Sequence, residues 1–170
     1  MRVFIAMGSN IAPRADYLSR ARDAMRRLSA DGEVQCAPIF SSAPVDCPPE
    51  AGEFLNTAVS IQWEGGSLMD LLDELQAIER EFGRNREVAL PPNSPRTIDL
   101  DILFTEPACV ESTPRLQLPH PRLHLRRFVL EPLAALAPDS HPLASPASTK
   151  DLLESLDSSE PPLSVTAPQW

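Results

Sequence analysis

The sequence predicts an α+β fold in which helices pack on a mixed or antiparallel sheet. Two observations carry this prediction. Strand patterns alternate with amphipathic helix patterns along the chain. The strand patterns at 34–40 and 54–63 follow each other with no helical pattern between them, which favours antiparallel pairing because parallel strands need a long crossover. We therefore expect a layered α+β sandwich rather than a doubly wound parallel sheet.

The first half of the chain contains three expected strands and two expected helices. Apolar runs or alternation predict strands over 3–7, 34–40 and 54–63, and apolar residues at helical spacing predict helices over 15–28 and between Ser67 and Gly83. Ser67 begins the second helix because it forms a capping box with the acidic residue three positions later, and Gly83 is suited to end it. Between the second and third strands, the prolines of 41–52 predict a loop.

The second half contains fewer expected elements and a polar end. The expected elements are a proline-rich loop over 84–95, strands over 97–104 and 116–119, and a helical pattern over 123–136 that Pro132 interrupts. From Ser145 onwards, serine, proline and acidic residues dominate, and this composition predicts a flexible tail that contains at most one or two helical turns over 150–156. We therefore expect one functional domain over 1–144 and a flexible tail over 145–170.

Composition excludes several classes of function. The formal net charge of -9 argues against general binding to nucleic acids or anionic membranes, which need a basic surface. No apolar run approaches the ~20 residues of a membrane-spanning helix, and the N-terminal apolar run is too short for a signal peptide. Three cysteines without a CxxC pair indicate neither a disulfide framework nor a zinc site. We expect a cytoplasmic monomer.

The strand expected over 97–104 carries the strongest chemical signal. Strand periodicity places Asp99 and Asp101 on one face, with Cα atoms about 6.5–7 Å apart. The opposite face receives Ile98, Leu100, Ile102 and Phe104. Carboxylates at that separation can converge on two Mg²⁺ ions about 4 Å apart, the arrangement used in phosphoryl chemistry. The alternative is an ordinary solvated strand face.

Two further groups of residues suggest ligands for this polar face. Several arginines flank the acidic pair, and guanidinium groups are suited to phosphate oxygens; they are Arg84, Arg86, Arg96, Arg122, Arg126 and Arg127. Phe54 and Asn56 share one strand face, where a ring and an amide would suit a flat heteroaromatic ligand. The sequence has no P-loop or kinase glycine loop.

The combination of motifs resembles the 6-hydroxymethyl-7,8-dihydropterin pyrophosphokinase family. The matching segments are IAMGSN at 5–10, FLNTAV at 54–59, QAIE at 76–79, GR at 83–84, PRTIDLDIL at 95–103, and the segment from PH at 119–120 to RRF at 126–128. The resemblance implies a ferredoxin-like αβα sandwich. It also implies an enzyme of folate biosynthesis that transfers pyrophosphate from ATP to the pterin hydroxymethyl group and releases AMP.

The resemblance further implies roles for individual residues. Asp99 and Asp101 would hold two Mg²⁺ ions, and Arg84 and Arg96 would act with them in catalysis. The implied pterin-binding residues are Ser42, Ala43, Val45, Phe54, Asn56 and Phe128. The implied ATP-binding residues are Gln76, Glu79, Arg84, Arg96, Ile102, Arg115, Gln117, His120 and Arg126. In the loop before Pro95, PNS at 92–94 stands where many relatives have Arg-Trp-Gly.

Two other functions are compatible with the same residues. A nucleotide-sensing regulatory domain would bind ATP without forming AMP when the reduced pterin is supplied. A purely structural domain would have no affinity for Mg·ATP, because its aspartate face would only be solvated.

Overall fold

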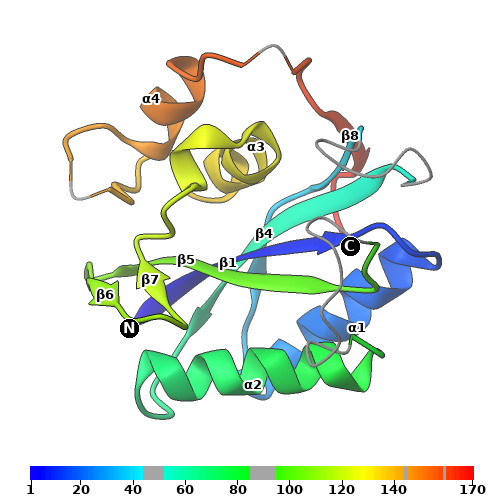
Figure 1. Ribbon diagram of the computed structural model, residues 1–170, viewed down its shortest axis with the longest axis vertical. Coiled ribbons are helices and arrows are strands. Elements are labelled where there is room, and N and C mark those ends of the chain that lie inside the picture. The colour runs from blue at the N-terminus through cyan, green and yellow to red at the C-terminus, as the bar shows by residue number, and fades with distance from the viewer. Residues whose placement is uncertain (44–51, 85–94, 144, 159) are drawn as a thin grey trace.

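A six-stranded antiparallel sheet forms the middle layer of the molecule (Figure 1). The computed structural model describes residues 1–43, 52–84, 95–143, 145–158 and 160–170. The sheet has the order β5-β1-β4-β3-β8, and β2 also pairs with β4. Its strands are β1 (Arg2–Ser9), β2 (Gln35–Cys36), β3 (Ile39–Ser42), β4 (Phe54–Gln62), β5 (Asp99–Glu106) and β8 (Ser164–Ala167). Every pairing among the described residues is antiparallel, which confirms the expected sheet type.

Helices cover both faces of this sheet. In Figure 1, α1 and α2 lie on one side, and α3 and α4 lie on the other. The helices are α1 (Arg14–Arg26), α2 (Leu68–Glu81), α3 (Arg127–Leu136) and α4 (Thr149–Glu154), with a short 3-10 helix η1 (Leu123–Leu125) before α3. None of the helices in the described ranges combines the length and the apolar character needed to cross a bilayer. The αβα sandwich is thereby confirmed.

Local sequence signals explain where the elements begin and end. The capping box of α2 forms as predicted, because Asp70 N donates to Ser67 Oγ at 3.2 Å and Ser67 N donates to Asp70 Oδ2 at 2.8 Å. The strand expected over 34–40 is instead divided into β2 and β3, since Pro38 has no N–H for a strand ladder. Helix α3 continues past Pro132, where an interruption was expected. The expected strand at 116–119 is β7 (Gln117–Leu118), which pairs with β6 (Glu111–Ser112).

A β-bulge in β5 divides its apolar residues between two cores. Phe4 pairs with Phe104, but the next residue of β1 pairs with Ile102, so Leu103 is an extra residue in β5. Ile102 packs in the core beneath α1 and α2, whereas Leu103 and Phe104 pack in the core beneath α3. The expectation that Phe104 shares a face with Ile98, Leu100 and Ile102 is therefore wrong. From Asp99 to Ile102, before the bulge, side chains still alternate between the two faces of the sheet, so the two aspartates share one face.

The C-terminal segment contains the short helix allowed over 150–156 and a strand where a flexible tail was expected. Helix α4 packs on α3, and leucines from 152 to 156 join the core beneath α3. Strand β8 then pairs with β3, and the indole of Trp170 donates a hydrogen bond to Ala37 O at 2.8 Å. Local composition cannot predict the pairing of β8 with β3 or the hydrogen bond from Trp170 to Ala37, because these partners lie more than a hundred residues away in the chain. The expected boundary at 144/145 stays a prediction.

Candidate active site

Small side chains on β1 leave space above the sheet on the side of α3. Gly8 pairs with Asp99 on one neighbouring strand and with Asn56 on the other, while Ala6 pairs with Asp101. The three strands therefore bring an acidic pair and an amide to one face across two strand spacings, about 10 Å. A cavity of about 390 Å³ opens there between the sheet and α3, a volume in the range of small-molecule sites.

Asp99 lies between two of the arginines that are predicted to bind phosphate. Arg84 Nη1 donates to Asp99 Oδ1, and Arg96 Nη1 donates to Asp99 Oδ2 at 2.5 Å. Each of the three side chains is only about one-fifth exposed, so solvent screens these pairs less than it screens surface pairs. A phosphate entering this end of the cavity would compete with Asp99 for guanidinium donors.

A fully buried carboxylate fixes one of these arginines. Glu79 Oε1 accepts hydrogen bonds from Arg84 Nη1 at 2.6 Å and from Leu100 N at 2.9 Å. The Leu100 bond joins α2 to the edge of the sheet, because β5 is an edge strand. Glu79 has no exposed surface, so its contacts position the β5 edge and Arg84 from behind the cavity.

The end of β1 holds Arg96 through its backbone. Arg96 N donates to Asn10 Oδ1 at 2.7 Å, and Asn10 N donates to Arg96 O at 3.2 Å. This reciprocal pair joins segments that are 86 residues apart. The GSN motif that begins at Gly8 thus contributes both the open space beside Asp99 and the anchor for the arginine next to it.

The segment before α3 places a neutral imidazole and two arginines on the cavity wall. His120 N donates to Leu103 O at 2.7 Å. Arg122 N donates to His120 Nδ1 at 3.2 Å, so the imidazole proton is placed on Nε2. Burial, together with the charges of Arg126 and Arg122, lowers the pKa of His120 from 6.5 to about 4, although Asp99 acts in the opposite direction. Burial, followed in size by the charge of Arg122, also lowers the pKa of Arg126.

Aromatic and polar side chains from β3, β4 and α3 line the other end of the cavity. Phe54 and Phe128 are both partly exposed to it. Asn56 Nδ2 donates to Ser42 Oγ at 2.8 Å, which fixes the buried amide beside Ala43. The guanidinium of Arg126 lies 5.4 Å from the centre of the Phe128 ring. Two rings and an oriented amide are suited to a planar ligand with hydrogen-bonding edges.

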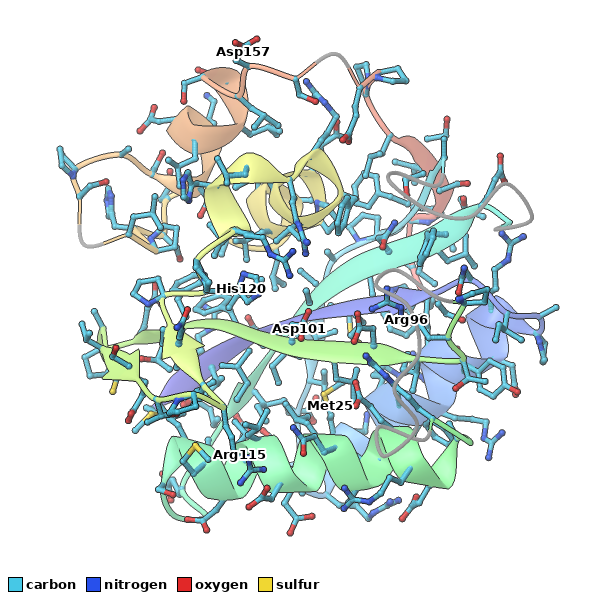
Figure 2. The ribbon with its side chains drawn as sticks, viewed as in Figure 1. Met25, Arg96, Asp101, Arg115, His120 and Asp157 are labelled. Carbon is cyan, nitrogen blue, oxygen red and sulfur yellow. The ribbon has the colours of Figure 1, made fainter. Side chains whose placement is uncertain are left out.

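The chemistry of the donors fits a divalent cation that also binds phosphate. Figure 2 shows Asp101 on the side of the sheet that faces His120 and α3, and both aspartates line the same cavity. Mg²⁺ prefers oxygen ligands and typically takes one or two carboxylates together with phosphate and water. The described part of the chain contains no group of three or more acidic, histidine or cysteine side chains arranged for a metal, and a site of the Mg²⁺–phosphate kind does not require one.

Ten of the predicted site residues line the cavity together. They are Ser42, Ala43, Phe54, Asn56, Arg96, Asp99, Asp101, His120, Arg126 and Phe128. Arg84 reaches this group through its ion pair with Asp99. Val45, like Arg86 and the PNS segment at 92–94, lies outside the described residues.

Besides Arg84, five predicted ATP-binding residues lie outside the cavity. They are Gln76, Glu79, Ile102, Arg115 and Gln117. Arg115 lies beside α2 (Figure 2), where it pairs with Asp73 and contacts Gln76 Oε1 at 3.5 Å. Ile102 is only 2% exposed and packs in the core beneath α1 and α2. These residues surround the outer edge of β5 rather than the space above the aspartates.

The cavity also contains residues outside the predicted set of substrate- and metal-binding residues. Arg122 lines it as one member of the predicted arginine group, whereas Arg127 pairs with Glu131 at 3.0 Å. Gly8 lines it too, and the GSN motif was the available signal. Glu160 lines it from the C-terminal segment, and no local sequence signal pointed to it because that segment was expected to be flexible.

Comparisons with known proteins identify the family. The family model described as 7,8-dihydro-6-hydroxymethylpterin-pyrophosphokinase (HPPK) matches residues 4–138. The chain is 41% identical over 138 residues to the 2-amino-4-hydroxy-6-hydroxymethyldihydropteridine pyrophosphokinase of Pseudomonas aeruginosa, covering 81% of this chain and 82% of that one. It is 39% identical over 146 residues to the Bacillus subtilis protein of the same name, covering 86% and 84%.

A solved structure shows the same fold at low sequence identity. A Plasmodium falciparum HPPK-DHPS triple mutant with pteroate superposes with a TM-score of 0.68 and 11% identity, covering 90% of this chain and 42% of that one. The likeness confirms the ferredoxin-like sandwich. Because the family model spans most of the chain and two bacterial relatives match at about 40% identity, the chain belongs to the 7,8-dihydro-6-hydroxymethylpterin-pyrophosphokinase family.

Proposed function

We propose that the protein transfers pyrophosphate from ATP to the hydroxymethyl group of 6-hydroxymethyl-7,8-dihydropterin and releases AMP, a step of folate biosynthesis. The observation that carries this proposal is a single cavity that joins a pair of carboxylates, three guanidinium groups and two aromatic rings. The first two groups are suited to a metal–triphosphate complex, and the rings are suited to a pterin. The names of the bacterial relatives describe the same activity.

The proposed reaction is an in-line displacement at the β-phosphorus of ATP. The hydroxyl oxygen of the pterin forms a bond to the β-phosphorus while the bond from that phosphorus to the oxygen bridging to the α-phosphate breaks. The electron pair of the broken bond leaves with AMP, and the hydroxyl proton passes to solvent. Because little covalent chemistry falls to the protein in such a reaction, its contribution is to position the two substrates and stabilise charge.

Asp99 and Asp101 are the proposed ligands of two Mg²⁺ ions. Their support is the shared face on β5 and the preference of Mg²⁺ for carboxylate and phosphate oxygens. When bound, Mg²⁺ would offset phosphate charge and lower the pKa of the acceptor hydroxyl. Arg84 and Arg96, already beside Asp99, would donate to the transferring phosphates and stabilise charge that builds in the transition state.

The remaining walls would hold the two substrates. His120 is neutral at physiological pH, so its Nε2–H can donate to phosphate oxygen without the charge of an imidazolium, and Arg126 lies beside it. Phe54 and Phe128 would stack on the pterin, with Asn56 on its edge and Ser42, Ala43 and Val45 around it. The proposed border of the nucleoside includes Gln76, Ile102, Arg115 and Gln117. Glu79, also predicted to bind ATP, is fully buried and would act by holding Arg84 and the edge of β5.

The protein acts in this proposal as a cytoplasmic monomer whose partners are small molecules. Light scattering on a size-exclusion column tests the monomer, and fractionation of the cells that make the protein tests its location.

Release of AMP tests the proposed activity directly. Purified protein with ATP, Mg²⁺ and 6-hydroxymethyl-7,8-dihydropterin should form AMP and a pterin diphosphate in equal amounts, and omission of the pterin should stop both. Asp101→Asn should keep its fold but lose about a hundredfold or more in turnover, the scale of losing one transition-state contact. Asp157→Asn is the matched control because this exposed aspartate does not line the cavity and lies far from Asp101 (Figure 2). Wild-type turnover in the Asp101 variant would contradict the metal assignment.

A further inference from the structure

The C-terminal segment is anchored on both sides of the cavity. On one side, α4 packs on α3, and buried Thr149 donates from its N and its Oγ1 to Ser140 O at 2.8 and 3.1 Å. On the other side, β8 extends the sheet beyond β3, with Ser164 opposite Ser41. Between these anchors, Leu163 N donates to Glu131 Oε2 of α3 at 3.0 Å. The described residues 155–158 and 160–163 therefore lie between α4 and β8 alongside α3.

Further contacts fix the end of this segment. Trp170 donates to Ala37 O and lies under the guanidinium of Arg22, 5.1 Å from the ring centre. Together with Ala167, it packs against the core beneath α1 and α2. Because β8 pairs with β3 and is followed by the partly buried Trp170, the residues just before it have a defined position relative to β3.

Glu160 enters the cavity from this segment. It is partly buried and lines the cavity together with Ser42, Ala43 and Phe128. Its backbone is turned by a hydrogen bond from Glu160 N to Ser158 Oγ at 3.1 Å. Glu160 lies three residues before Leu163, so their Cα atoms are at most about 10 Å apart. Leu163 N donates a hydrogen bond to Glu131, which lies one helical turn after Phe128 on α3.

The acidic pair and Glu160 approach the cavity from opposite edges of the sheet. Asp99 and Asp101 belong to β5 at one edge, and Glu160 leads into β8 at the other. Four strand spacings separate those edges, about 19 Å. A third carboxylate beside the triphosphate would be repelled by it. Because Glu160 leads into β8 next to β3, it is better suited to the end of the cavity that β3 and β4 line.

The acceptor has matching hydrogen-bond donors at its far end. In the 2-amino-4-hydroxy-6-hydroxymethyl pteridine named for the relatives, the reacting hydroxymethyl and the 2-amino group are on different rings at opposite ends of the bicycle. The 2-amino group and the neighbouring ring N–H of the oxo form are donors side by side, and a carboxylate offers acceptors only. Asn56 Nδ2 donates to Ser42, which leaves Asn56 Oδ1 as an acceptor for one of these two donors. The second donor needs another acceptor on the wall.

We infer that the C-terminal segment completes the pterin end of the cavity and that Glu160 accepts a hydrogen bond from the 2-amino edge of the pteridine. Glu160 is then a specificity-determining residue contributed by a segment beyond the part of the chain, residues 4–138, that the family model matches. This inference rests on the proposed function, because that function supplies the ligand. It predicts that Glu160 affects recognition of the pterin and leaves recognition of ATP unchanged.

Binding of two pteridines to two variants tests the inference. The probes are 6-hydroxymethyl-7,8-dihydropterin and its analogue without the 2-amino group, titrated calorimetrically in the presence of Mg²⁺ and a non-hydrolysable ATP analogue. For the normal pterin, Glu160→Ala should raise Kd about tenfold or more, the scale of a lost charged hydrogen bond. For the analogue, wild type and Glu160→Ala should bind equally, because the donor is already missing. Glu160→Gln keeps one acceptor oxygen, so its Kd for the normal pterin should lie between those of wild type and Glu160→Ala.

Controls separate this inference from the proposed function and from a structural effect. Glu154→Ala removes an exposed carboxylate of α4 and should leave both Kd values unchanged. An unchanged Kd for the normal pterin in Glu160→Ala, or an equal loss for both pteridines, would overturn the inference while AMP release still supports the function. If Glu160→Ala fails to fold, Glu160→Gln decides by the same comparison. Absence of AMP release by wild type would instead refute the function.

Discussion

Titration of His120 gives a quantitative test of the cavity's electrostatics. Burial and the nearby charges of Arg126 and Arg122 lower the pKa of this imidazole from 6.5 to about 4. Arg122 N donates to Nδ1, so the side chain at pH 7 is neutral with its proton on Nε2. We expect a phosphate-bearing ligand to raise this pKa, because negative charge beside the ring would offset the two arginines.

The same shift makes stability depend on pH in a known direction. The folded pKa lies below the unfolded value, so the unfolded chain binds the proton more readily between about pH 4 and 6.5. Folding stability therefore rises as pH increases through this window and levels off above it. A full shift of this size corresponds to about 3 kcal/mol. Because the ring is partly exposed and solvent screens it, we expect about 1–2 kcal/mol.

Two measurements check the prediction. Nitrogen-15 NMR of the histidine rings, with His120→Asn to assign the resonance, should give a midpoint near pH 4 and a higher one after addition of Mg·ATP. Urea unfolding of wild type and His120→Asn should show the wild type losing stability relative to the variant between pH 7 and pH 4.5. A midpoint above pH 6 in the free protein, or a stability difference independent of pH, would refute the reasoning.

Two other substitutions probe the frame of the cavity. Gly8→Ala would place a Cβ 3.3 Å from Asn56 Oδ1, so the amide must shift. Overpacking of about 1 kcal/mol should raise the KM for the pterin about fivefold and leave the KM for ATP nearly unchanged. A pterin KM equal to that of wild type in steady-state assays would contradict this prediction. Glu79→Ala removes the carboxylate that accepts hydrogen bonds from Leu100 N and from the Arg84 guanidinium. The free energy of unfolding, measured by urea denaturation, should fall by about 2–4 kcal/mol. Glu79→Gln keeps an acceptor oxygen and should lose less than half of that free energy.

Short-range periodicity was sufficient to predict the acidic pair but not the whole of its strand. Asp99 and Asp101 share a face because alternation depends only on the local backbone, and their pairing with Gly8 and Ala6 preserves it. The bulge at Leu103 arises from the register between β5 and β1, which no window of one strand contains. The shared face of the two aspartates was therefore predictable, whereas the face of Phe104 at the other end of β5 was not.

Composition failed where distant partners determine structure. Serine, proline and acidic residues after Ser145 predict poor burial, yet Trp170 and β8 find partners on β3 and at Ala37. Strand β3 would otherwise offer an unpaired edge, and covering an edge is a common use of an additional strand. A single late tryptophan in a polar segment was the available signal, since a large apolar ring is seldom retained without a surface to pack on.

Glu79 shows how resemblance and geometry answer different questions. Resemblance names Glu79 among the residues that contact ATP, but a carboxylate with no exposed surface cannot reach a ligand unless its surroundings move. Its hydrogen bonds to Leu100 N and Arg84 instead fix the strand that carries the aspartates and the guanidinium beside them. Loss of Glu79 should then affect catalysis through the position of Arg84, so kcat should fall along with stability while the pterin KM changes little. The geometry favours a positioning role, in which the α2 carboxylate fixes the donors at the phosphate end of the cavity.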